Sequence, residues 1–362
     1  MKLIHCADLH LDAKMETGLD TARARERRIE LLMTFSRLVE AATEHHATVV
    51  LLAGDLFDTA RVTEKTRRFV GDTILSHPEL TFVSVRGNHD SAVSPLFPDD
   101  LPPKNWHDLS SGEGWNRLTL DGVTVYGRTC PTTPEDYDAL PAPDADGYRI
   151  VLLHGQVTSG NSVGEDRIAL GRLAGRGIDY LALGHEHTFR CEPLDARGVW
   201  AYAGCPEGRG FDECGDKGCI LLDTDRTGEE AVRFLPLCRR RLHDLNVVLD
   251  GCISFGDVLA RVTDAVADID GSDMVKVTLT GELAPEVVRD TLHLLRVLNE
   301  RFYFARIKDE CRLLIRPEDY LGDISLKGEF IRTVLASPLT EEQKQRTILV
   351  GLRALRGEEV DA

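Results

Sequence analysis

The chain has 362 residues, which is too long for one small core and favours a large α/β domain with a smaller companion. Charged residues make up 28% and hydrophobic residues 42% of the sequence, a globular composition that excludes disorder and collagen-like repeats. The net charge of −17 argues against a protein that coats nucleic acid by bulk attraction, although a local basic patch can act within an acidic whole.

The sequence predicts a soluble, cytoplasmic protein that does not engage a membrane. No apolar run approaches the roughly 20 residues that a transmembrane helix needs. The start of the chain, from Met1 to Asp8, turns polar too early for the apolar segment of a signal peptide. The nine cysteines are scattered without a Cys-x-x-Cys pair, so we expect reduced thiols.

Five short apolar runs in the first two-thirds of the chain each end in a polar cluster. Runs of four to eight aliphatic and β-branched residues bounded by glycine are typical of buried strands. Helices are predicted over residues 21–44 and 61–76. The predicted strands cover residues 2–6, 48–53, 80–85, 148–153 and 178–183, and the clusters that follow them contain Asp8 and His10, Asp55, Asn88-His89-Asp90, His154, and His185 and His187.

Hairpin-like strands accompany this pattern. The Asp121-Gly122 pair predicts a hairpin between strands over residues 115–120 and 123–127, and further strands are expected over 199–203 and 219–223. Buried strands, crossover helices and hairpins together predict an α/β fold in which two sheets form a sandwich flanked by helices.

A domain boundary is predicted near residues 236–244, where three consecutive arginines at 239–241 interrupt the pattern. We therefore expect a first domain over residues 1–240, a small α+β domain over 241–317 and a helical tail over 318–362. Residues 340–343 of the tail have the form of a capping box. The arginines at 239–241, and those between 23 and 28, form either a basic patch or, as we favour, a solvated face of a helix or linker.

The polar clusters offer carboxylates, an amide and imidazoles, which suit divalent ions. Because each cluster follows a strand at its carboxyl end, a sheet would bring them to one edge. Each cluster alone could be a turn or a pair of core histidines, but five at the same position argue against that explanation. Seven O and N ligands suit two ions with one bridging carboxylate, and the lack of cysteine argues against a structural zinc site. The candidate ligands are Asp8, His10, Asp55, Asn88, His154, His185 and His187.

Together the clusters resemble the five motifs of the calcineurin-like metallophosphoesterases. Residues 6–11, 53–58 and 210–218 narrow the resemblance to SbcD-type DNA repair exonucleases and their YhaO relatives, over about residues 1–240. The resemblance implies a metal-dependent DNA exonuclease or endonuclease that acts in DNA repair and recombination. It also implies that the small α+β domain caps DNA and that the tail docks on an SMC-like ATPase of the SbcC/YhaN type. A homodimer through the two predicted helices is compatible with it.

The resemblance also distributes roles among the candidate residues. Asp55 would bridge two ions, one held also by Asp8, His10 and His187, the other by Asn88, His154 and His185. Manganese is the metal that the family implies, and iron, zinc or magnesium would fit the same donors. His89 would not be a ligand. It would protonate the leaving oxygen while Asp90 orients its other ring nitrogen.

Two positions depart from the family pattern. Asp58 stands where the archaeal and eukaryotic nucleases of this type have a second catalytic histidine, so Asp58 is left to bind a ligand backbone or solvent. Cys205 follows Gly204 where the family has serine or asparagine. It would lie near the metals, as a buried small side chain, a ligand or a redox-sensitive thiol.

The motifs specify phosphoester hydrolysis better than they specify DNA, so two alternatives stay open. One is a phosphatase or phosphodiesterase for small molecules or proteins, which would need a closed pocket and no capping domain or tail. The other is a mainly structural subunit that binds DNA ends and licenses an ATPase. The complete ligand set argues against the second, although fold alone does not guarantee activity.

Overall fold

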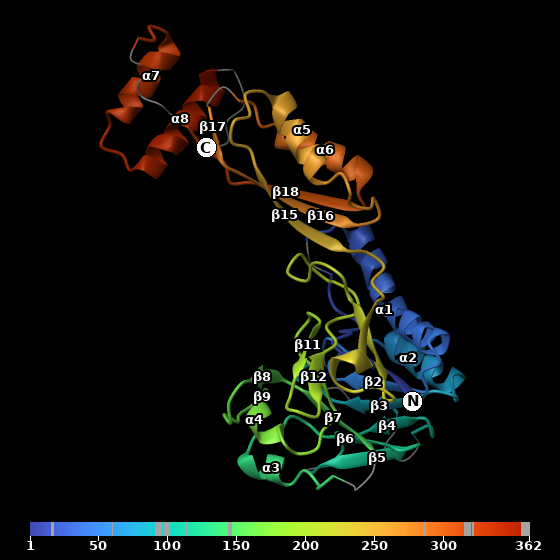
Figure 1. The fold of residues 1–362 in the computed structure, drawn as a ribbon. Coiled ribbons are helices and arrows are strands. Elements are labelled where there is room, and N and C mark those ends of the chain that lie inside the picture. Colours follow the sequence, from blue (N-terminus) through green and yellow to red (C-terminus); the bar gives the residue numbers. More distant parts are fainter. Residues whose placement is uncertain are drawn as a thin grey trace. The chain divides into compact units, whose positions relative to one another are not determined.

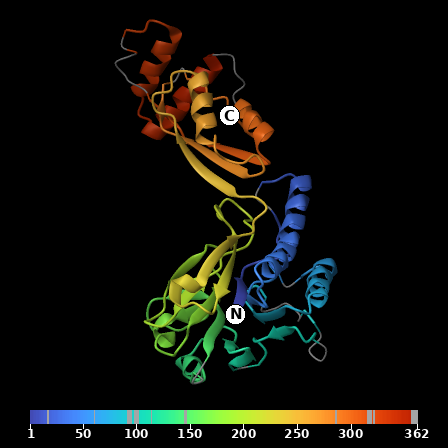
Figure 2. The ribbon, with the colours of Figure 1, turned by 45° about the vertical axis from the view of Figure 1, so that its right-hand side comes forward.

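The computed structural model describes residues 1–355 except 16–17, 60, 91–95, 98–101, 113, 144–146, 285–286, 315–319 and 321. The chain packs as two compact units, Met1–Arg241 and Leu242–Ala362 (Figures 1 and 2). The boundary expected between the small domain and the tail, at 317–318, lies outside the described residues.

The first unit contains two six-stranded sheets (Figure 1). In the first sheet the order is β14-β13-β1-β2-β3-β4, with β1 to β4 mutually parallel and β13 antiparallel to both of its neighbours. Its elements are β1 (Lys2–Cys6), β2 (Val49–Ala53), β3 (Thr81–Val85), β4 (Trp106–Asp108), β13 (Gly218–Asp223) and β14 (Val232–Pro236), the last preceded by the 3₁₀ turn η1 (Gly228–Ala231).

The second sheet has the order β11-β12-β10-β7-β6-β5, with four parallel strands between two antiparallel edges. The predicted hairpin is confirmed: Asp121 and Gly122 have φ of 42° and 83°, as a two-residue turn of this kind requires. The strands are β5 (Asn116–Leu120), β6 (Val123–Gly127), β7 (Tyr148–His154), β10 (Tyr180–Gly184), β11 (Arg190–Pro193) and β12 (Val199–Tyr202), beside a separate pair, β8 (Gln156–Thr158) and β9 (Arg167–Ala169).

Alternate side chains of the central strands fill two different cores. In β2, Val49 and Leu51 point between the sheets, into a core shared with Leu152 of β7. Val50 and Leu52 point to the opposite face and belong to a second core. Because both faces are buried, the strand is apolar throughout, which is why the sequence showed continuous apolar runs.

Helices cover the outer faces of both sheets. The first sheet packs against α1 (Thr21–Glu44) and α2 (Glu64–Ser76), and the second against α3 (Pro134–Asp138) and α4 (Leu170–Leu173). The predicted α/β sandwich of two sheets flanked by helices is therefore confirmed. No helix of the described residues has both the length and the apolar character that crossing a lipid bilayer requires.

The second unit begins with a three-stranded parallel sheet, ordered β15-β16-β18. Val258 and Val262 of α5, with Leu294 and Leu298 of α6, pack into the core of this sheet. The elements are β15 (Leu242–Val248), α5 (Phe255–Ala265), β16 (Met274–Thr280), α6 (Thr291–Arg301) and β18 (Phe304–Asp309), with the short pair β17 (Glu282–Leu283) and β19 (Arg312–Leu313).

Two helices near the end of the chain, α7 (Leu326–Leu335) and α8 (Glu341–Leu355), form a helical pair with its own small core. The helices meet closely where the Phe330 ring lies against Gly351, since a Cβ at Gly351 would come within 2.1 Å of that ring. The expected capping box is present: Gln343 N–H donates to Thr340 Oγ1, and Thr340 N–H donates to Gln343 Oε1.

Candidate metal centre

The predicted polar clusters lie at the carboxyl ends of strands in the middle of both sheets. Asp8 and His10 follow β1, Asp55 follows β2, and His185 follows β10. These four residues have backbone φ angles of 52°, 44°, 51° and 111°, in a region that residues other than glycine rarely adopt. Such backbone conformations cluster at functional sites, so the strain supports a function for these loops.

The first group of candidate ligands contains Asp8, His10 and His187, whose ligand atoms lie within 4.8 Å of one another. Nε2 of His10 and Nε2 of His187 are 3.2 Å apart. Asp8 is buried, and its two carboxylate oxygens each accept from the backbone N–H of His185 at 3.0 Å. Burial raises the pKa of Asp8, and the His185 N–H only partly opposes that rise. A bound cation would favour the ionised carboxylate.

The second group contains Asp8, Asp55 and His154. Nδ1 of His154 lies 2.9 Å from the carbonyl oxygen of Ala53, so Nδ1 carries the proton and Nε2 carries a lone pair. This Nε2 lies 2.9 Å from Oδ1 of Asn88 and 3.4 Å from Oδ2 of Asp55. Three electron-pair donors thus face one another, with no proton of their own to join them. That arrangement fits a cation among them.

The carboxylate of Asp55 belongs to the second group and also faces His10 of the first. Its Oδ2 is 3.4 Å from Nε2 of His154 and 3.7 Å from Nε2 of His10, while Oδ1 accepts from the His89 N–H at 2.9 Å. Gly87 makes room for the carboxylate, because a Cβ there would come within 2.1 Å of Oδ1. A single carboxylate oxygen that faces histidines of both groups would suit a ligand shared by two ions.

The structure also brings His185 to the centre. Its ring stands edge to face against the ring of His154, with 5.4 Å between the centroids. Among the described residues, however, its ring nitrogens belong to none of the tight groups of candidate ligand atoms. Its backbone N–H, in contrast, binds Asp8 directly.

His89 lies at the exposed rim of the centre. Its ring stands edge to face on His10, with centroids 4.8 Å apart. Nδ1 of His89 lies 2.8 Å from the backbone carbonyl oxygen of Asp58, which can only accept. Nδ1 therefore carries a proton, and Nε2 is the atom that can exchange a proton with a ligand.

The expected contact between Asp90 and His89 is corrected by the structure. The carboxylate of Asp90 instead accepts from the backbone N–H groups of Leu56 and Phe57, both at 3.0 Å. Burial raises the pKa of Asp90 to about 6, although these N–H groups oppose the rise. Asp90 points inward because the turn after β2 offers it donors, and it thereby fixes the loop that carries Asp55.

Two carboxylates lie behind the histidines of the first group. Oδ1 of Asp58 is 3.2 Å from Nδ1 of His10, close but not aligned as a hydrogen bond, and Oε1 of Glu213 is 2.7 Å from Nδ1 of His187. Burial alone would raise the pKa of Glu213, but hydrogen bonds from His187 and Arg209 outweigh it and hold that pKa below its ordinary value. Arg209 donates to Asp58 at 3.1 Å and to Glu213 at 2.7 Å.

Sequence reasoning did not assign these surrounding residues. The motif at 210–218 included Glu213, but gave it no role, and Asp58 was left to a ligand backbone or solvent. Both residues lie in loops, where no hydrophobic periodicity marks a functional position. The resemblance of residues 53–58 and 210–218 to the family was the only indication of a role.

Cys205 is buried beside the first group without joining it. Its Sγ lies 3.6 Å from the carbonyl oxygen of His187 and 3.8 Å from Oε2 of Glu213. Burial raises the pKa of this thiol well above its ordinary value. In this structure the thiol therefore packs as a small, neutral, hydrogen-bonded side chain.

A cleft of about 540 Å³ adjoins the second group, which is within the range of ligand sites. Asn88 and His154 line it, and so does Arg86, whose guanidinium lies 3.3 Å from Asp108. The remaining lining residues are Gly87, Ser110, Thr129, Cys130, Thr132, Glu165 and Asp166.

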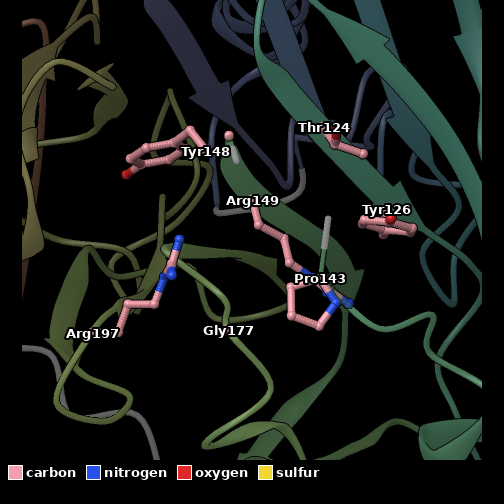
Figure 3. Close-up of a pocket in the computed structure, with 8 residues that line it drawn as sticks. Thr124, Tyr126, Pro143, Tyr148, Arg149, Gly177 and Arg197 are labelled. Carbon is pink, nitrogen blue, oxygen red and sulfur yellow. The ribbon is translucent and has the colours of Figure 1, made fainter. Parts of the chain in front are cut away.

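A smaller hollow at the opposite end of β7 is shown in Figure 3. There the Arg149 guanidinium lies over the Tyr126 ring at 4.7 Å, and Arg197 forms a bidentate pair with Asp179 at 2.8 and 2.9 Å. Tyr148 and Arg149 begin the strand that His154 ends, so this hollow is separate from the candidate metal centre.

Comparison with known proteins agrees with the resemblance drawn from the motifs. The family model for calcineurin-like phosphoesterases matches residues 1–189. The chain is similar to an uncharacterised metallophosphoesterase of Bacillus subtilis, YhaO, with 29% identity over 266 residues, 68% of this chain and 61% of that protein.

Two archaeal proteins are similar at the same level. Both are DNA double-strand break repair proteins named Mre11. The protein of Methanopyrus kandleri is 27% identical over 263 residues (65% of this chain, 56% of that protein), and that of Saccharolobus solfataricus is 29% identical over 239 residues (62% and 60%). The match thus spans between 56% and 61% of the length of the three relatives.

Proposed function

The chain belongs to the calcineurin-like phosphoesterase family, and on that premise we propose that it is a metal-dependent nuclease that hydrolyses phosphodiester bonds of DNA during repair. The observation that carries the proposal is the convergence of electron-pair donors from both sheets on the Asp55 carboxylate. The two Mre11 relatives, which are named as DNA repair proteins, favour DNA over other phosphoesters.

The proposed centre holds two divalent ions that share Asp55. Asp8, His10 and His187 would hold the first ion, and Asn88 and His154, with His185 beside them, the second. Manganese suits these oxygen and imidazole donors. When bound, the ions supply an activated water at neutral pH and neutralise the charge of the phosphate.

His89 is proposed to protonate the leaving oxygen. Nε2 is the ring atom left to exchange a proton with a ligand, because Nδ1 donates to the Asp58 carbonyl oxygen. The ring therefore has a fixed orientation before substrate binds, as a positioned acid requires. Asp90 contributes through the loop that it ties to Leu56 and Phe57, and we assign it no proton transfer.

The second unit is proposed to act on DNA and on a partner. Residues 241–317 would cap the DNA, and the helical tail would dock on an SMC-like ATPase. Leu326 and Leu355 are 72% and 45% exposed at the same end of the α7–α8 pair, which favours a partner surface there. Ile29 and Met33 of α1, 49% and 43% exposed, similarly favour a homodimer through the first unit.

One comparison of substrates tests the proposed function. The protein, freed of metal by a chelator and reloaded with Mn²⁺, is incubated with end-labelled duplex DNA and separately with bis-p-nitrophenyl phosphate. We expect both to be cleaved, with no cleavage of either by the metal-free protein. Cleavage of the small ester alone would identify a small-molecule phosphodiesterase. Binding of DNA ends without cleavage of either substrate would identify a structural subunit.

A further inference from the structure

The two histidines of the first group, His10 and His187, come from distant parts of the chain. A single arginine side chain contacts both of the carboxylates that lie behind their rings. His10 follows β1 and His187 follows β10 in the other sheet. Behind each ring stands a carboxylate, Asp58 at 3.2 Å from His10 Nδ1 and Glu213 at 2.7 Å from His187 Nδ1. Arg209 bonds both carboxylates, through Nη1 to Asp58 at 3.1 Å and through Nη2 to Glu213 at 2.7 Å.

Each carboxylate favours a proton on the ring nitrogen that faces it. Glu213 does so through its contact with His187 Nδ1, and Asp58 does so through its charge, 3.2 Å from His10 Nδ1. An ionised carboxylate only accepts, so it favours a proton on Nδ1 and leaves a lone pair on Nε2. The two Nε2 atoms are the ones that face each other at 3.2 Å. Nη2 of Arg209 also lies 3.3 Å from His187 Nδ1, but the shorter contact with Glu213 decides the proton position.

We propose that Arg209 is a positioning residue that sets the metal affinity of the His10–His187 half of the centre by holding Asp58 and Glu213 in place. This inference rests on the proposed metal centre, and does not depend on the identity of the substrate. Arg209 lies outside residues 1–189, the part of the chain that the family model matches.

The planar guanidinium is the feature that lysine would not reproduce. Its Nε and Nη2 both face Glu213, at 3.1 and 2.7 Å from Oε1, while Nη1 reaches Asp58 from the other side. A guanidinium offers several donors in a rigid fork, whereas an ammonium is a point charge on a flexible stem. Arg209 thus fixes two carboxylates at once and also reduces the repulsion between them.

The surrounding loop has anchors of its own, so Arg209 is not needed to hold it. Glu207 is fully buried and accepts from the Arg27 guanidinium at 2.9 Å and the Arg37 guanidinium at 2.8 Å. Beyond Arg209, the Lys217 ammonium donates to the carbonyl oxygen of His187 at 2.7 Å. Replacing Arg209 should therefore leave the loop folded, which separates a positioning role from a structural one.

Binding of Mn²⁺ to metal-free Arg209→Met and Arg209→Lys, measured by titration calorimetry and by electron paramagnetic resonance, tests the proposal. We expect one of two sites in Arg209→Met to weaken by about 10- to 100-fold, the loss typical of groups that orient metal ligands. The other site should keep its affinity, and Arg209→Lys should be intermediate. Arg197→Met removes a bidentate ion pair far from the centre and should bind like the parent protein.

Two results would overturn the proposal. Unchanged Mn²⁺ affinity at both sites in Arg209→Met would show that Asp58 and Glu213 keep their positions without Arg209. Equal weakening of both sites, together with a lowered thermal unfolding midpoint, would show that Arg209 is structural. A parent protein that binds fewer than two ions would instead contradict the proposed metal centre itself, before any variant is compared.

Discussion

Nε2 of His10 and Nε2 of His187 lie 3.2 Å apart, although 177 positions separate the two residues in the chain. One follows a strand of the first sheet and the other a strand of the second, so the pair forms only when the two sheets have packed. With the proton of each ring on Nδ1, two lone pairs face each other here, and a cation between them would stabilise that arrangement. The fold therefore brings together two candidate metal ligands that neither sheet could supply alone.

Replacing Asp55 by Asn should lower metal content and abolish hydrolysis together. Asparagine keeps an oxygen for the His89 N–H, but loses the charged oxygen that faces both His10 and His154. A shared carboxylate stabilises two cations at once, so we expect the bound metal to fall from about two equivalents to less than one. Elemental analysis after dialysis measures this. Asp179→Asn, at a remote ion pair, is the control, and two full equivalents in Asp55→Asn would refute the bridge.

Replacing His89 by Gln should keep both metals and DNA binding while lowering turnover by about 10²- to 10⁴-fold, the usual contribution of a positioned acid. The loss should be much smaller on bis-p-nitrophenyl phosphate, because p-nitrophenolate leaves without a proton. Steady-state rates on the two substrates give the comparison. An equal loss on both would argue against proton donation by His89.

The sequence was sufficient to place the candidate ligands because their chemistry is local. Asp8, His10 and Asp55 each follow an apolar strand within a few residues, and parallel strands bring their carboxyl ends to one edge. The strands themselves were visible because both faces of each sheet are buried, which makes the runs continuously apolar.

The surrounding charges could not be predicted in the same way, because they depend on contacts between distant loops. Arg27 belonged to a stretch interpreted as a solvated helix face, yet it is fully buried and pairs with Glu207, 180 positions later. Arg240 is also buried, with its guanidinium on Glu30 of α1. Asp90 was misassigned for a similar reason, since its partners are backbone N–H groups of another loop.

The stability of the first unit should fall as the pH drops from about 6.5 to about 3, in part because of His5. This side chain is fully buried against the Tyr180 hydroxyl at 2.7 Å, and burial lowers its pKa to about 3, against a smaller opposing effect of the Leu183 carbonyl. Below pH 6.5 His5 is protonated in the unfolded chain but stays neutral in the folded one. The free energy of unfolding therefore falls by up to about 1.4 kcal/mol for each pH unit.

The contribution of His5 is measured by urea unfolding at several pH values. The His5→Asn variant should be less stable at pH 7. Its free energy of unfolding should decline less steeply between pH 6.5 and 3, because asparagine takes up no proton in the unfolded chain. Replacing the exposed His46 by Asn is the control and should leave the slope unchanged. A slope in His5→Asn equal to that of the parent protein would contradict this account.

The exposed end of the α7–α8 pair should be needed for partner binding and not for catalysis. Leu326→Gln with Leu355→Gln changes two exposed side chains and leaves the core around Ile331 and Ile348 intact. We expect loss of co-purification with an SMC-like ATPase of the same organism and loss of ATP-stimulated cutting, with unchanged Mn²⁺-dependent activity of the isolated protein. Retained co-purification would exclude this surface as the docking site.

The Mn²⁺ positions in crystals grown at a saturating concentration of the metal test the central claim most directly. An anomalous difference map at the manganese edge should show two peaks on either side of Asp55. One should adjoin His10 and His187, and the other His154 and Asn88. A single peak, or two peaks of which only one touches Asp55, would contradict a two-ion centre bridged by this carboxylate.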